Sequence, residues 1–137
     1  MIEGWSEESY LVLFDPADAD ALSSAYALSE SLPGYRLIGL LFWDDFIVED
    51  AHGAKFTVPT VPSIQKYVQP FVDEIPAHDS ISLRADGRFT GKIRWYITPL
   101  IFGGDPQAEQ NISWIDLKSH AAAVKWWNQK YREVAAQ

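Results

Sequence analysis

The sequence predicts an α+β fold: a single domain over residues 1–137, with an antiparallel sheet of about five to six strands flanked by an N-terminal and a C-terminal helix. Three observations support this. A chain of 137 residues is typical of one domain. Its 47% hydrophobic and 22% charged residues are typical of a globular protein. Finally, several short apolar runs lie between two segments of helical periodicity, without the regular strand–helix alternation of a doubly wound sheet.

The first third of the chain predicts a strand, a helix and a second strand. Residues 10–14 form a short apolar run that is typical of a strand. Asp15-Pro16 suits a helix start, because Asp caps well and Pro fits the first helical position. Apolar residues then recur at helical spacing over 16–32, and Pro33-Gly34 ends the helix. Residues 35–43 are apolar on both faces, which indicates a central strand.

The middle of the chain predicts a hairpin and a short helix. Residues 46–49 and 55–58 are strand-like and flank a turn sequence, Asp-Ala-His-Gly-Ala. The segment 59–62 contains two prolines and is expected to leave the sheet, since proline cannot donate to a ladder. Ser63 is then expected to cap a short helix that ends near Phe71.

The last third predicts a second hairpin, a short strand and a long helix. Residues 80–83 and 89–101 flank Asp86-Gly87, a strong hairpin signal. A glycine-containing loop precedes the short strand 112–115. Ser119 is the expected cap of the last helix, which should bury an apolar stripe against the sheet. That stripe consists of Val124, Trp127, Tyr131 and Val134.

Charge is unevenly distributed along the chain, whose net charge is −8. Residues 1–79 carry 14 acidic and three basic side chains, a net charge of −11, whereas residues 80–137 carry five acidic and eight basic ones, a net charge of +3. Because Lys and Arg supply most non-specific affinity for phosphates, an acidic chain is not expected to bind nucleic acid. A cationic protein partner would be attracted instead.

The sequence also bears on compartment. It has no apolar run near the ~20 residues that span a bilayer, and residues 1–9 carry three Glu and no basic residue. We therefore expect a cytoplasmic protein that does not bind membranes. The chain contains no cysteine, which excludes disulfides, thiolate catalysis and cysteine-based zinc sites.

The densest acidic cluster does not favour catalysis. It consists of Asp44, Asp45, Glu49 and Asp50. In an extended strand the two neighbouring aspartates point to opposite faces, and four rises of ~3.3 Å separate Asp45 from Glu49 by about 13 Å. Paired glycosidase carboxylates lie at most ~9.5 Å apart. The cluster is therefore expected to be either a pair of solvated strand ends or a surface that faces a partner.

Other candidate residues also lack a catalytic pattern. The three histidines, His52, His78 and His120, have no metal-binding spacing and are expected at the surface or as caps. Gly103-Gly104-Asp105 could cradle an anion but is better explained as a turn that lets the loop pass close to the sheet. No hydrolase or other catalytic motif is present. We therefore expect no enzymatic activity, no cofactor and no metal site.

Two of the six tryptophans are candidate contact residues. Trp43 stands beside the acidic pair, where either a core position or a partner contact is open. Trp126 points about 100° away from Trp127 on the last helix, so it either borders the core or is exposed. Exposed tryptophans beside charges are typical of interfaces.

Three stretches resemble the SMI1/KNR4 (SUKH) superfamily of bacterial immunity proteins. These are residues 43–50 (WDDFIVED) with Gly53, residues 98–106 (TPLIFGGDP), and Trp126-Trp127-Asn128. The resemblance covers under a fifth of the chain. It implies an α+β domain that binds and blocks a secreted toxin, often a nuclease, inside the producing cell. It implies no catalytic residues.

The first hypothesis is an immunity-type protein that occludes a cationic toxin domain through an acidic face. The expected contact residues are Trp43, Asp44, Asp45, Glu49, Asp50, Asp73 and Glu74. A second hypothesis is a non-catalytic interaction module with a cellular protein partner. A third is a small-ligand-binding or hydrolytic domain that uses the 103–105 loop. The third predicts a deep pocket beside that loop, with a carboxylate or histidine of perturbed pKa.

Overall fold

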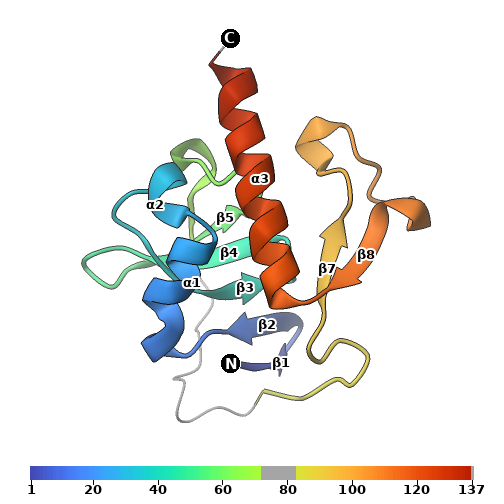
Figure 1. The fold of residues 1–137 in the computed structure, drawn as a ribbon. Helices are drawn as coiled ribbons and strands as arrows, with labels where there is room; N and C mark the ends of the chain where they lie inside the picture. The colour runs from blue at the N-terminus through green and yellow to red at the C-terminus, as the bar shows by residue number, and fades with distance from the viewer. Residues whose placement is uncertain (72–82, 137) are drawn as a thin grey trace.

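Figure 1 shows the computed structural model of the protein, which describes residues 1–71 and 83–136. Within these residues an antiparallel sheet has the order β1-β2-β3-β4-β5-β6, and a second ribbon pairs β7 with β8. The strands are β1 (Ile2–Ser6), β2 (Ser9–Leu13), β3 (Arg36–Leu41), β4 (Asp45–Glu49), β5 (Lys55–Pro59), β6 (Gln69–Pro70), β7 (Ile93–Tyr96) and β8 (Ile112–Ile115). The helices are α1 (Ala19–Ala25), α2 (Leu28–Ser31) and α3 (Leu117–Ala135). The predicted α+β class is confirmed.

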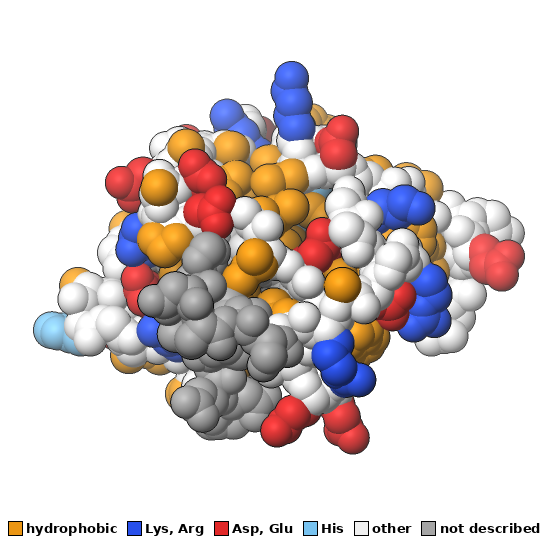
Figure 2. All heavy atoms as spheres, turned by 90° about the horizontal axis from the view of Figure 1, so that it is seen from below, with side chains coloured by type: hydrophobic (Ala, Val, Ile, Leu, Met, Phe, Trp, Pro, Cys, Tyr) orange, Lys and Arg blue, Asp and Glu red, His pale blue; other side chains and the backbone are white. Residues whose placement is uncertain are grey.

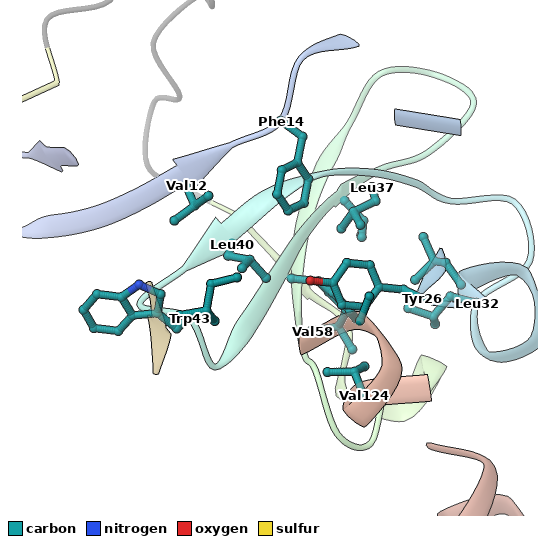
Figure 3. Close-up of a cluster of buried hydrophobic side chains, with 14 of the residues drawn as sticks. Val12, Phe14, Tyr26, Leu32, Leu37, Leu40, Trp43, Val58 and Val124 are labelled. Carbon is teal, nitrogen blue, oxygen red and sulfur yellow. The ribbon is translucent and has the colours of Figure 1, made fainter. Parts of the chain in front are cut away.

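Hydrophobic side chains fill both faces of the six-stranded sheet. In the larger cluster, side chains of the sheet such as Leu40 and Val58 face Tyr26 at the end of α1 and Val124 of α3 (Figure 3). A smaller cluster around Ile47 covers the opposite face, and no helix residue joins it. Strand β3 contributes to both clusters and lies between β2 and β4, which confirms the prediction of a central strand.

The predicted helix over 16–32 is interrupted. A short 3₁₀ turn (Pro16–Asp18) leads into α1, and Ala27 then adopts a left-handed conformation with φ of 53° before α2 begins. Tyr26 and Leu28 are both buried. Side chains two residues apart in a continuous helix point about 200° apart, so the break at Ala27 lets both of them reach the core.

The predicted hairpin of residues 46–49 and 55–58 is confirmed as β4 and β5. Its turn is closed by the Asp50 side chain, which accepts hydrogen bonds from the backbone N–H groups of His52 (2.9 Å) and Ala54 (3.0 Å). The sequence did not predict β1, which pairs with β2 along its whole length.

The prediction of a short helix after Ser63 is wrong. The segment contains one 3₁₀ turn (Gln65–Tyr67) and then joins the sheet as β6. An N-cap side chain must accept hydrogen bonds from the helix. The Ser63 hydroxyl instead donates to the carbonyls of Pro59 (3.0 Å) and Thr60 (2.7 Å), so it stabilises a loop.

The second predicted hairpin can be compared only in part, because residues 80–82 lie outside the described part of the chain. Residues 87–91 form a turn, so the strand expected over 89–101 is shortened to β7, which begins at Ile93 and pairs with β8. Asp86-Gly87 does mark a turn, in which the Asp86 side chain accepts hydrogen bonds from the Arg88 N–H and from the Trp5 indole N–H (3.1 Å). The hydrogen bond with Trp5 attaches the turn to β1.

The long C-terminal helix is confirmed, with two corrections. Its cap is Asp116, whose carboxylate accepts the Ser119 N–H at 2.7 Å, because the helix begins two residues before Ser119. Its buried face consists of His120, Ala121, Val124 and Asn128. From the predicted stripe, Val124 is buried and Val134 is 49% exposed. His120 is therefore a core residue and not the surface or capping residue expected.

Candidate functional site

A groove with a cavity of about 330 Å³ opens beside Asp45, the first residue of β4. We call it the Asp45 groove. One wall is formed by residues 59–62 with Tyr67, and the other by residues 95–96 with residues 99–101. Asp44 and Asp45 supply the carboxylates. Most of the lining side chains are apolar or aromatic, as is usual for binding sites.

The first wall is held in place by α3. The buried Asn128 side chain accepts the Ser63 N–H (2.9 Å) and donates to the Thr60 carbonyl (2.8 Å). The Thr60 N–H in turn donates to the Asp44 carbonyl (2.9 Å). A single side chain of the C-terminal helix therefore fixes this wall relative to the carboxylates.

The second wall is held by Asn111 and by a glycine. Asn111 accepts the Thr98 N–H (2.7 Å) and donates to the Thr98 carbonyl (3.1 Å), so it pairs with this residue as a second strand would. A Cβ atom on Gly104 would lie only 1.9 Å from the Thr98 oxygen. The N–H groups of Gly103 and Gly104 donate to nearby carbonyls, of Leu100 (3.0 Å) and Pro99 (3.2 Å). This agrees with a close turn and leaves neither N–H free to cradle an anion.

The turn between β3 and β4 delivers the two aspartates to the groove. Phe42 and Trp43 are both left-handed, with φ of 47° and 64°, a conformation that costs an aromatic residue about 1–3 kcal/mol. The Trp43 ring is only 5% exposed and contacts the rings of Tyr10, Phe89 and Trp114. It thus lies in the core beneath the site. These ring contacts hold the strained turn in its left-handed conformation.

The two carboxylates of the groove differ in their partners. Asp44 forms an ion pair with Arg94, whose guanidinium also lies over the rings of Trp43 (5.4 Å) and Tyr96 (5.1 Å). Within the described residues, no hydrogen bond or ion pair engages the Asp45 side chain. Burial raises the pKa of both carboxyl groups above the usual range, and Arg94 partly offsets this effect on the pKa of Asp44.

The remaining predicted contact residues lie elsewhere. Glu49 is at the opposite end of β4, within 3.4 Å of both Arg36 and Lys55. Asp50 is engaged in the β4–β5 turn. The structure thus does not gather Asp44, Asp45, Glu49 and Asp50 into one cluster. Asp73 and Glu74 lie outside the described residues.

Exposed apolar side chains border the groove, and sequence analysis did not single them out as contacts. Leu100 and Ile101 line it and are each 47% exposed, and the neighbouring Ile97 is 51% exposed. The available signal was an apolar run directly before Gly103-Gly104, at the end of the segment expected to be a strand. Trp126 is 57% exposed, on the outer side of α3.

Buried polar chemistry is also present below the groove. His120 is fully buried, with its Nδ1 atom 2.6 Å from the Tyr26 hydroxyl and its ring 5.4 Å from that of Trp95, which lines the groove. Burial lowers the pKa of His120 to about 4, so the imidazole is neutral at pH 7. In the part of the chain that the structure describes, no group of three or more His, Asp or Glu side chains could hold a metal ion.

No family model, curated protein or solved structure matches this chain. The similarity to the SMI1/KNR4 superfamily therefore stays a prediction from the sequence. Among residues 1–71 and 83–136, no helix has both the length and the apolar character needed to cross a membrane.

Proposed function

We propose that this chain is a non-catalytic protein-binding domain of the immunity type, which occludes a toxin by docking it on the Asp45 groove and its rim. The observation that carries the proposal is the rim itself. Leu100 and Ile101 are large, half exposed and line the same groove as Asp45, whose carboxylate has no hydrogen bond or ion pair within the described part of the chain. Exposed apolar side chains next to a few polar groups are typical of interfaces.

The charge of the chain supports a cationic partner. The net charge of −8 would speed the approach of a basic toxin domain, while the apolar rim would supply the desolvated centre that affinity requires. The same features would serve a cellular protein partner. Co-expression separates the two, since only a toxin partner would make host growth depend on this chain.

A second candidate is a domain that binds a small ligand. The groove lies beside the segment that leads into the 103–105 loop, and its carboxyl groups have raised pKa values, as that hypothesis predicts. Its volume of about 330 Å³ is near the lower limit of ~300–1,000 Å³ for ligand sites. The exposed rim favours a protein partner over a ligand that would be enclosed.

The experiment is co-purification from the native host, identification of the bound protein, and measurement of its affinity for defined variants. The double variant Leu100→Ser/Ile101→Ser should weaken binding by at least about tenfold, which corresponds to about 1.4 kcal/mol. Val134→Ser removes an equally exposed apolar side chain elsewhere and is the matched control. Equal affinities of wild type and the double variant would exclude the rim as the docking surface.

A further inference from the structure

We propose that the Asp45 groove receives one arginine side chain of the partner, carried on a segment whose residues next to the arginine are apolar. This inference rests on the proposed function and names the chemistry that the groove would recognise. It follows from three features of the groove: its charged residues, the side chains that line its walls, and its volume.

Among the described residues, the groove carries one more negative than positive charge, because Asp44 and Asp45 are adjacent and the Arg94 ion pair is with Asp44. The left-handed residues of the β3–β4 turn and the Thr60 N–H, which donates to the Asp44 carbonyl, hold the backbone at the aspartates. A partly buried carboxylate without a partner is costly, and one guanidinium would remove that cost.

The walls suit an arginine better than a small hydrated cation. The aliphatic part of an arginine would lie against Val61, Pro62 and Leu100, and its guanidinium is weakly hydrated and favours aromatic faces such as that of Tyr96. Arg94 already shows this arrangement, since it combines an aspartate partner with the faces of two aromatic rings. The proposed ligand repeats that arrangement from outside.

The size of the groove limits what can enter. A cavity of about 330 Å³ takes one or two side chains and not a folded element. Leu100 and Ile101 then remain at the rim for the apolar residues on either side of the arginine.

The test uses the full-length, isotopically labelled protein and two synthetic peptides, acetyl-Ser-Val-Arg-Leu-Ser-amide and the same peptide with citrulline in place of arginine. Citrulline has nearly the same shape but no charge. We expect the arginine peptide to shift the backbone amide resonances of residues 60–61, 95–98 and 100–101, and to bind at least about tenfold more tightly than the citrulline peptide. Asp45→Asn should abolish this difference, whereas Glu8→Gln, at an exposed site, should preserve it.

Several results would overturn the inference. They are equal binding of the two peptides, resonance shifts confined to other surfaces, and equal affinity for free acetyl-arginine-methylamide, which lacks the apolar neighbours. The natural partner separates this inference from the proposed function. If Asp45→Asn binds that partner normally while Leu100→Ser/Ile101→Ser does not, the arginine inference is wrong and the docking surface stands. If both variants bind normally, the proposed function fails as well.

Discussion

Asp45 has a charge that its surroundings do not neutralise. Burial raises the pKa of its carboxyl group, and no described side chain pairs with it. Glu49, at the opposite end of β4, is by contrast paired with Arg36 and Lys55. A residue that lowers stability and makes no stabilising contact is a candidate for a functional role.

Asp45→Asn should therefore stabilise the protein at pH 7. Because the folded-state pKa is raised above the unfolded value, the ionised carboxylate destabilises the fold once the pH exceeds the unfolded value. We expect a higher Tm for the Asn variant at pH 7, and this gain should disappear near pH 3, below the unfolded-state pKa of the carboxyl group. Thermal unfolding followed by circular dichroism measures this, with Glu8→Gln as the control. A lower Tm of the Asn variant would show that Asp45 has a structural role.

His120 is the second residue whose titration should affect stability. Its folded-state pKa of about 4 is below the unfolded value of 6.5, so the unfolded chain binds more protons between these two pH values. Stability from the neutral imidazole is complete above pH 6.5 and is lost as the pH falls towards 4, by about 3 kcal/mol. Urea unfolding at pH 7 and pH 4.5 should show this loss. His120→Asn should remove most of it, and an unchanged pH dependence would contradict the assignment.

At the scale of elements, the groove depends on connections between segments far apart in the chain. Asn128 reaches Ser63 across 65 positions, and Arg94 reaches Asp44 across 50. Each wall continues from a strand, β5 or β7, into irregular backbone that is hydrogen-bonded by an asparagine side chain. These hydrogen bonds let the irregular part of each wall keep its shape outside the sheet.

Gly104→Ala tests whether the second wall is built as described. The added methyl group would overlap the Thr98 carbonyl at 1.9 Å, so the loop must move away from β7. We expect the free energy of unfolding to fall by about 2 kcal/mol or more, and the partner to bind more weakly. Gly87→Ala is the matched control, because nothing lies within 4 Å of its added Cβ. Comparable unfolding midpoints for the two variants in urea would contradict the close approach.

For the molecule as a whole, the net charge should matter more to a cationic partner than any single acidic patch. The face in Figure 2 shows acidic and basic side chains interspersed. The acidic residues of β4 likewise lie at its two ends. The net charge of −8 still generates a long-range attraction for a cationic partner.

Association with a basic partner should therefore slow with added salt. Between ~0.01 M and ~0.15 M salt the Debye length falls from about 30 Å to about 8 Å, and we expect the association rate constant to fall on the order of tenfold. Stopped-flow measurements give this rate constant. Neutralising Asp44, Asp45, Glu49 and Asp50 together should reduce the rate constant at low salt. An identical low-salt rate for that variant would remove these residues from the association step.

Local patterns along the chain were enough to predict the fold class, the β4–β5 hairpin, the central strand and the last helix. Periodicity, turn residues and capping act over a few neighbours, so such patterns carry this information. The density of charge also pointed to Asp44 and Asp45. Three features became clear only in three dimensions: the pairing of β7 with β8, the burial of His120 and Trp43, and the position of Leu100 and Ile101 beside a groove. The reason is that each of these outcomes depends on packing between segments distant in the chain, which leaves no local signature.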